Sequence, residues 1–562
     1  MRLQECHMVL STLTDLPNEL LFSIFQELDD ASIFQIGKLC RRLNEIAMPF
    51  ILAREGLADP GACSILKPYH EDYQDSLSAL TLNFSIHSID SLFCILDDAT
   101  ADGYPATIPS LTRSVERISQ LVARLTFIDT FHITFYKADS RWSLDSEDVR
   151  EFMAAFLHLL ETLTTKSCRS LQILHPHPIA FNSGYDFDSM LAFKTKRLRI
   201  ADPLSSPSHG DEWQYRLDPE LNPLYPIPFP SIQSSITTLD IISDFLFVPP
   251  FSKWTFHLMK ISPITSLSIS IHRFTRKDEF SLYILPRIIN SVPKLQEIKL
   301  AFSCDDFTHI LTKNLSRLPL LQKITTGLLV YPNMTSNSNP QRSIPFTLPH
   351  LTSFTGSPEQ GVVLLEDMTC PQLHSVNLLI DISPRGKFDY SIAAHAFSNL
   401  ARRFDTLKIR PRINVCLVTC GGRPFGNNPD EESPKPSWVR HFRSVSRLTL
   451  EMPRFFHDDN ETSSQIDYAL EWLSVFQGVV GLTLTTQRPA RDDAARELRD
   501  MALRNAITKK FPKILHFNVT EVSVGAHYHW SNPIDELSRV GRVISDMTSP
   551  NELASSSICC DF

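Results

Sequence analysis

The sequence predicts an α/β chain in which a short all-α segment precedes a long region built around a parallel β-sheet. Three observations lead to this prediction. Apolar residues recur at helical spacing between residues 13 and 56, the pattern apolar-x-x-apolar-x-apolar recurs between residues 110 and 530, and amphipathic stretches separate its copies. With 562 residues, the chain is long enough for several domains or for one long repeat array.

The amino-terminal segment is predicted to form two or three short helices. Pro17 suits the start of a helix, and apolar residues follow it at helical spacing: Leu20, Leu21, Ile24, Phe25 and Leu28. Asp29 or Asp30 can cap a second helix, and we expect Pro49 to end the last one. From spacing alone, an ordinary helical cap on the following domain is an equally good interpretation.

The same segment, residues 13–56, resembles an F-box. The resemblance is carried by Leu16-Pro17-x-Glu19-Leu20, by Ile24-Phe25-x-x-Leu28 and by Leu39-Cys40-Arg41-Arg42-Leu43, where Leu43 stands at a position that is Trp in many F-boxes. The resemblance implies that the segment docks on a Skp-type adaptor and, through it, on the cullin of a ubiquitin ligase. It also implies the adaptor-facing or motif-core positions: Leu16, Pro17, Leu20, Ile24, Leu28, Leu39 and Cys40.

The strand-like pattern recurs along most of the remaining chain. Its middle position falls at residues 131, 171, 198, 239, 267, 298, 324, 354, 376, 407, 448, 482 and 517, with a mean spacing of about 32 residues. Strands and helices that alternate at this period predict a parallel sheet with the helices outside it. A doubly wound enzyme is the rival fold, but it normally has glycine-rich turns after its strands.

This pattern resembles leucine-rich repeats of the long, helix-bearing kind, although the asparagine ladder of that family is missing. The resemblance implies that the F-box helices are followed by an irregular α/β solenoid with a curved parallel sheet. An F-box joined to divergent leucine-rich repeats resembles the large F-box families of mushroom-forming fungi.

The predicted domain organisation follows from these patterns and from proline-rich or polar stretches. An amino-terminal tail (1–12) precedes the F-box (13–56), a connecting helical region (57–110) and the solenoid (111–530). Loops interrupt the solenoid at 202–231, 331–349 and 419–437, and a helix and tail (531–562) follow it.

Composition excludes several classes of function. The net charge of −9 argues against a general nucleic-acid or membrane-surface binder, and 17 glycines against 38 prolines leave little room for phosphate-binding loops. Eleven scattered cysteines favour reduced thiols in the cytoplasm or nucleus. Neither a secretory signal nor a membrane-spanning run is evident, so we expect no membrane partner.

Short chemical motifs are weak throughout the chain. Gly421-Gly422-x-x-x-Gly426 lacks the Lys-Ser/Thr of a phosphate loop, and Cys416-x-x-x-Cys420 lacks a second pair of zinc ligands. The histidine pairs at 175/177 and 527/529 lack a nearby third ligand, and the ending Cys559-Cys560-Asp561-Phe562 is a poor prenylation motif. We therefore expect no catalytic residue, metal or cofactor.

The remaining candidate is the polar face of the predicted sheet, where a solenoid usually binds its partners. The candidate client-binding residues are Lys408, Arg410, Arg447, Glu451 and His516, and the cations among them favour an acidic element of a client. The favoured function is a non-catalytic substrate receptor of a Skp–cullin–F-box ubiquitin ligase. A scaffold without ligase function and, less favoured, an α/β enzyme are the alternatives.

Overall fold

The structure is a computed structural model, and it describes residues 13, 16–57, 59–66, 75–96, 107–135, 147–174, 234–243, 245–247, 251–271, 284–302, 311, 314–327, 346–366, 368–382, 390–419, 440–451, 461–486 and 493–521. The chain divides into two compact units, Met1–Pro263 and Ile264–Phe562. The predicted tail at 1–12, the loop at 202–231 and the segment 531–562 lie outside the described residues.

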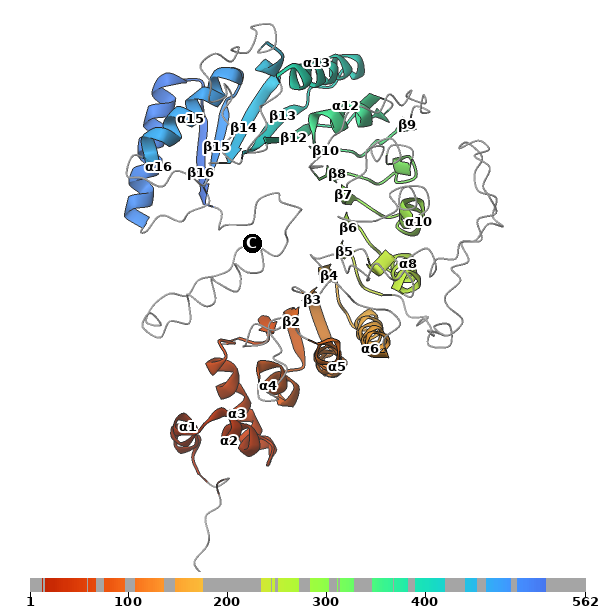
Figure 1. Cartoon of the computed structure of the whole chain (residues 1–562), viewed down its shortest axis with the longest axis vertical. Coiled ribbons are helices and arrows are strands. Elements are labelled where there is room, and N and C mark those ends of the chain that lie inside the picture. Colours follow the sequence, from red (N-terminus) through yellow and green to blue (C-terminus); the bar gives the residue numbers. More distant parts are fainter. Residues whose placement is uncertain are drawn as a thin grey trace, which may run out of the picture. The chain divides into compact units, whose positions relative to one another are not determined.

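Unit 1 begins with three helices, α1 (Asn18–Glu27), α2 (Asp30–Gly37) and α3 (Arg41–Arg54) (Figure 1). Asp29 caps α2 as predicted, because its Oδ1 accepts a hydrogen bond of 2.7 Å from the backbone N–H of Ser32. The three helices share a small apolar core, which is made of Leu21, Phe25, Ile33, Phe34, Leu43, Ile46, Ala47, Met48, Ile51 and Leu52.

Pro49 lies inside α3 and does not end it, so that predicted boundary was wrong. A proline inside a helix removes one backbone hydrogen bond and destabilises the helix by about 3 kcal/mol. Ile51 and Leu52 follow it, and both are 0% exposed. Burying two such side chains contributes about 1.5–3 kcal/mol each, which offsets the destabilisation and lets the helix continue to Arg54.

A parallel sheet follows in unit 1. Its strands are β1 (Cys63–Leu66), β2 (Ser88–Leu96), β3 (Phe127–Phe135), β4 (Ser170–Leu174) and β5 (Thr238–Ile242), and each pairs with the strand before it in the chain. The helices α4 (Ser76–Leu82), α5 (Ile108–Arg124) and α6 (Glu147–Thr164) alternate with these strands, and the 3-10 helix η3 (Phe245–Phe247) and α8 (Phe251–Ile261) end the unit.

The region 57–110 was predicted to be a helical connection, but it is only partly helical. It contains β1 and β2 as well as α4 and the start of α5. β2 carries the same apolar-x-x-apolar-x-apolar pattern at Ile89, Leu92 and Cys94, which pair in register with Ile128, Phe131 and Ile133 of β3. The pattern therefore extends to residues before 110, where it was not predicted, and the parallel sheet begins at Cys63.

Unit 2 has the same plan. Its strands are β6 (Ser266–Ile271), β7 (Glu297–Phe302), β8 (Lys323–Thr326), β10 (Ser353–Gly356), β12 (Ser375–Ile382), β13 (Arg412–Thr419), β14 (Val445–Glu451), β15 (Gly481–Thr486) and β16 (His516–Glu521). They are parallel and pair in chain order. A separate pair of two-residue strands, β9 (Phe346–Thr347) and β11 (Met368–Thr369), lies outside this sheet, and β9 falls within the predicted 331–349 loop.

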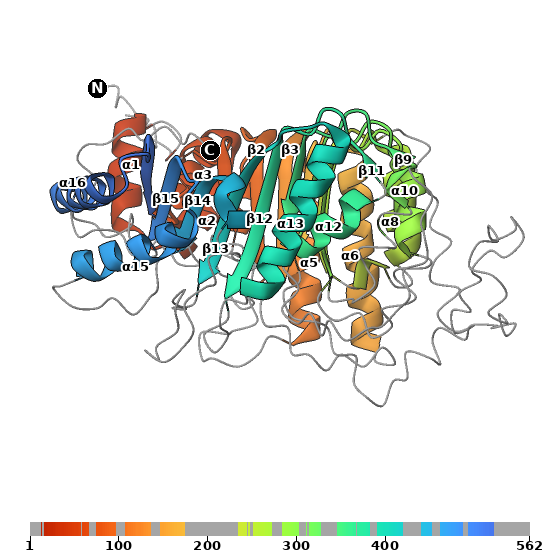
Figure 2. The ribbon, with the colours of Figure 1, turned by 90° about the horizontal axis from the view of Figure 1, so that it is seen from above.

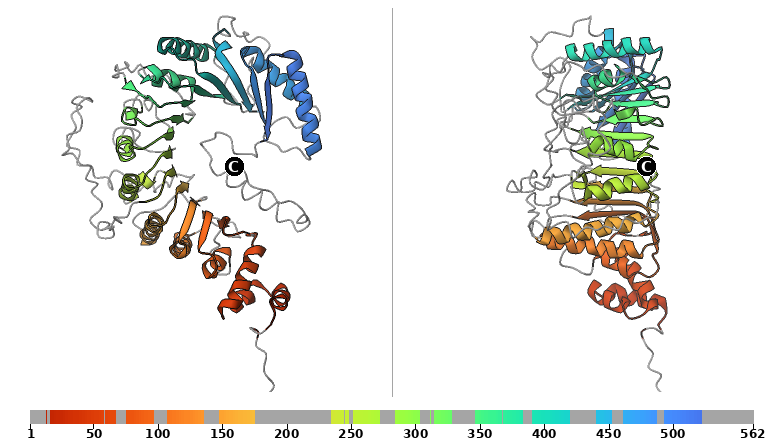
Figure 3. Two further views of the ribbon diagram at one scale, coloured as in Figure 1. Left: turned by 180° about the vertical axis from the view of Figure 1, so that it is seen from behind. Right: turned by 90° about the vertical axis from the view of Figure 1, so that its right-hand side faces the viewer.

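The helices of unit 2 lie together on one side of its strands (Figures 1 and 3). They are α10 (Leu285–Ser291), α12 (Pro358–Glu366), α13 (Tyr390–Leu407), α15 (Glu461–Val475) and α16 (Asp493–Lys510), with the 3-10 helix η5 (Arg440–Ser444) before β14. Figure 2 shows α12 and α13 side by side, and α12 contacts α13, β10 and β12. None of the helices in the described ranges is both long enough and apolar enough to cross a bilayer.

The predicted middle residues of the strands stack in register across the sheets. In unit 1, Phe131 pairs with Leu171 and Leu171 with Leu239. In unit 2, one row is formed by Leu267, Ile298, Ile324, Phe354 and Val376, and a second by Leu448, Leu482 and Phe517. Since a strand's side chains alternate between its two faces, each row presents one apolar face to the helices.

The strand predicted around residue 407 was wrong, because Leu407 is the last residue of α13 and the strand is β13. Lys408 ends the helix with φ +56°, its N–H donates to Asp405 O at 3.1 Å, and Ile409 N–H donates to Phe404 O at 3.0 Å. These two bonds form a Schellman motif, in which glycine usually occupies the left-handed position. A lysine there gave no sequence signal for the helix end.

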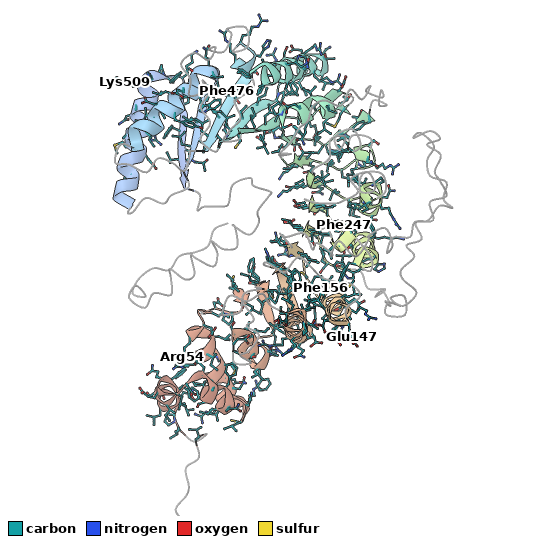
Figure 4. All side chains as sticks on the ribbon, in the orientation of Figure 1. Arg54, Glu147, Phe156, Phe247, Phe476 and Lys509 are labelled. Carbon is teal, nitrogen blue, oxygen red and sulfur yellow. The ribbon has the colours of Figure 1, made fainter. Side chains whose placement is uncertain are left out.

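Aromatic side chains pack against one another in the core of each unit. In unit 1, Phe156 of α6 packs edge-on against Phe135 of β3, with ring centroids 5.2 Å apart (Figure 4). In unit 2, Phe442 packs against Phe397 at 5.1 Å and against Phe476 at 5.2 Å. Phe135 and Phe442 are at most 1% exposed, so these contacts belong to the core of each unit.

Candidate protein-interaction surfaces

Arg54 holds the three amino-terminal helices together. Its guanidinium donates to the carbonyl oxygens of Phe25 and Leu28 at 3.1 Å each and to Asp30 Oδ1 at 2.7 Å, and it lies 4.6 Å from the ring centroid of Phe50. A cation at the end of α1 satisfies carbonyl groups that the helix leaves unpaired. Figure 4 labels Arg54 beside these helices. Its hydrogen bonds fix α1 against α3.

Two further polar residues fix this segment through contacts that the sequence did not indicate. Arg42 Nη2 donates to Leu16 O at 2.7 Å and to Asn18 Oδ1 at 3.0 Å, which holds the chain that enters α1. Asn44 is buried, and its Nδ2 donates to Gly37 O at 3.1 Å and to Leu82 O at 3.0 Å. These bonds tie α3 to α2 and to α4, and only the tertiary structure could reveal them.

None of the seven predicted adaptor-facing residues is fully buried. Leu20 is 51% exposed and Leu39 is 70% exposed, and Pro17 is exposed as well. The others are partly exposed: Leu16, Ile24, Leu28 and Cys40. Large exposed apolar side chains on one small helical segment are typical of a surface that a partner covers.

α1 divides its apolar residues between two environments. Leu21 and Phe25 are 0% exposed and belong to the core, whereas Leu20 and Ile24 lie beside them on the accessible side. Phe22 is 46% exposed and was not predicted as a surface residue. At 100° per residue it lies on the opposite side of α1 from Leu20 and Ile24, so helical geometry could have identified it.

Of the five predicted client-binding residues, three lie on strands of unit 2 and two lie outside them. Arg447 lies within β14, Glu451 is the last residue of that strand, and His516 begins β16. Lys408 and Arg410 lie in the turn between α13 and β13, so their predicted place on a strand was wrong. The reason is the Lys408 Schellman motif, which shifts the strand to 412–419.

A row of polar residues crosses unit 2 on the face turned away from the helices. In register, it consists of Thr355, Asn377, Asn414, Arg447 and His516, with Gly481 between the last two. Asn377 Nδ2 donates to Thr355 Oγ1 at 3.1 Å, and Asn414 Nδ2 donates to Asn377 Oδ1 at 2.7 Å. A Cβ on Gly481 would lie 3.2 Å from Cγ of Arg447, so the glycine leaves room for the arginine side chain.

Unit 1 carries a buried histidine on the corresponding face of its sheet. Nε2 of His132 in β3 is 2.8 Å from Thr134 Oγ1, and burial lowers the pKa of His132 to about 4.

Burial also raises the pKa of the Cys168 thiol in unit 1 to about 12 and that of the Cys370 thiol in unit 2 to about 11. Such thiols are poor nucleophiles, since the reactive species is the thiolate.

Within the described ranges, no three His, Cys, Asp or Glu side chains come together as a group that could hold a metal ion. The histidine pairs at 175/177 and 527/529, the glycine motif at 421–426 and the cysteines at 559 and 560 lie outside those ranges.

The comparisons with known proteins identify the amino-terminal segment. The profile of the family described as F-box-like matches residues 13–54, which are the residues of α1, α2 and α3 with the short chain before them. No curated protein matches the chain.

Proposed function

We propose that this protein is the substrate-recognition subunit of a Skp–cullin–F-box ubiquitin ligase. In this proposal, α1–α3 dock a Skp-type adaptor, and the α/β region acts as a leucine-rich-repeat-like solenoid that holds a protein client. The protein performs no chemistry itself. It raises the effective concentration of client lysines near the conjugating enzyme that the adaptor and cullin bring.

One observation carries the proposal. The F-box-like match covers α1–α3, and the same segment exposes Leu20 and Leu39 to solvent. The core of that segment is complete without these two leucines, because ten other apolar side chains fill it. An exposed apolar surface on a well-packed helical segment fits a partner helix or groove.

Two features support the client-binding part. Both units consist of parallel strands that pair in chain order, with helices between them, which is the arrangement that leucine-rich repeats use. Unit 2 also presents the polar row from Thr355 to His516 on the face away from its helices. In repeat proteins of this kind, such faces usually bind partners.

The adaptor-binding test uses the full chain with Leu20→Glu and Leu39→Glu combined. We expect the variant to lose binding to a purified Skp-type adaptor by at least about a hundredfold, since two exposed apolar contacts become charges. Binding is measured by titration calorimetry, and circular dichroism confirms that the helices remain folded.

The matched control is Phe84→Glu, which changes a side chain that is 53% exposed and lies outside α1–α3. It should leave adaptor affinity unchanged. Tight adaptor binding by the double variant would disprove the docking surface. If the wild-type chain binds the adaptor but does not bring cullin with it, the scaffold alternative replaces the ligase role.

A further inference from the structure

Five exposed arginines lie where β13 and β14 begin in unit 2. They are Arg410, Arg412, Arg440, Arg443 and Arg447, and we refer to them as the arginine edge. Because β12–β16 are parallel, the amino-terminal ends of all these strands lie at the same edge of the sheet. The arginines therefore share one side of unit 2.

The core of unit 2 holds the arginine edge in place. η5 has the sequence Arg440-His441-Phe442-Arg443-Ser444, in which Phe442 is 0% exposed and both arginines are exposed. Phe442 is anchored between Phe397 and Phe476. Gly478 packs so closely on this turn that a Cβ there would lie 2.0 Å from Arg443 O. The turn is thus fixed, and its arginines point away from the core.

The local charge is opposite to that of the whole chain. The described residues 402–419 and 440–451 hold eight Arg or Lys against two acids, Asp405 and Glu451, whereas the chain as a whole has a net charge of −9. No side chain of the arginine edge has an ion pair with a described residue. Concentrated cations without an ion pair among the described residues attract an anionic partner and steer its approach.

An apolar patch continues the arginine edge toward β16. Leu515 is 75% exposed and Val480 is 37% exposed. Their backbones are adjacent, since Leu515 N–H donates to Val480 O at 2.8 Å, and Val480 N–H donates to Ser446 O at 2.9 Å. Ser446 directly precedes Arg447, so the apolar patch adjoins the arginine edge.

We propose that the arginine edge and its apolar neighbours bind a short extended client segment that has consecutive carboxylates followed by apolar side chains. The guanidinium fork matches a carboxylate with two parallel hydrogen bonds, which suits arginine better than lysine. Four strand spacings separate β12 from β16, about 19 Å, which is the length of about six extended residues. This inference rests on the proposed client-binding role and names the class of client.

The test measures the binding of a fluorescent peptide, four Glu followed by two Leu, to the full-length chain by anisotropy. A peptide with Gln in place of each Glu is the first comparison, and single-stranded DNA of six nucleotides is the second. We expect the Glu peptide to bind most tightly. The Arg443→Glu/Arg447→Glu variant should weaken it at least about tenfold, since losing even one charge-assisted hydrogen bond costs about a factor of ten.

The matched control variant is Arg113→Glu/Lys260→Glu, which reverses two exposed charges in unit 1 and should leave peptide binding unchanged. Arg443→Gln/Arg447→Gln should weaken binding without adding repulsion, which keeps the test valid if the Glu variant misfolds. Leu515→Ser should weaken binding about threefold, because it removes part of the apolar patch.

The outcomes separate this inference from the proposed function when adaptor binding is measured on the same samples. Equal binding of the Glu and Gln peptides, equal loss in the control variant, or tighter binding of the DNA would overturn the inference while adaptor binding persists. Failure of the wild-type chain to bind the adaptor would refute the ligase role. The peptide titrations would then still show whether the arginine edge binds an acidic segment.

Discussion

At the scale of single residues, neighbours in the sequence have different roles because a helix turns 100° at each step. Leu20 and Leu21 are chemically identical, yet one is 51% exposed and the other 0%. Leu21 stabilises the helical core, whereas Leu20 is available to a partner. Substitutions at the two positions therefore test different properties, and the accessible leucines are the informative ones for adaptor binding.

His132 makes the stability of unit 1 dependent on pH. Burial holds its pKa at about 4, below the usual 6.5, so the unfolded chain binds a proton there that the folded chain does not. This contribution to stability is fully present above pH 6.5 and is lost as the pH falls toward 4, by about 3 kcal/mol. We expect His132→Gln to flatten the dependence of the urea midpoint on pH between 4 and 6.5. An unchanged slope would contradict this account.

At the scale of elements, the Lys408 Schellman motif has a measurable consequence. A non-glycine residue in the left-handed region is destabilised by about 1–2 kcal/mol. Lys408→Gly should therefore stabilise unit 2 by about 1 kcal/mol, as the urea midpoint would show, once the greater freedom of glycine in the unfolded chain is included. Lys408→Ala is the control and should bring no such gain, since alanine keeps the Cβ. Equal effects of the two variants would exclude backbone strain as the cause.

The same motif shows what element prediction from sequence could and could not do. Buried strands such as β7 and β15 were located correctly because their apolar residues have the expected spacing and pair in register. β13 was misplaced because Lys408 ends α13 without a glycine, and Pro49 gave a false helix end in α3. Packing of Ile51 and Leu52 outweighed local preference there.

At the scale of the whole molecule, the contrast between a net charge of −9 and the arginine edge predicts a strong salt dependence. Raising NaCl from 0.05 to 0.5 M shortens the Debye length from about 14 Å to about 4 Å. We expect binding of the Glu peptide to weaken about tenfold over this range and that of the Gln peptide to change little. Titrations at three salt concentrations would show this, and parallel curves for the two peptides would contradict it.

By itself, the sequence determined the α/β class, the amino-terminal helices with their F-box resemblance, and most strand positions, because apolar periodicity and short motifs are local properties of the chain. The tertiary structure decided which of the motif leucines are buried and which are accessible, since that depends on how α1, α2 and α3 pack. It also decided that Arg410, Arg412, Arg440, Arg443 and Arg447 share one edge. Residues distant in the sequence become neighbours only when parallel strands align their amino-terminal ends.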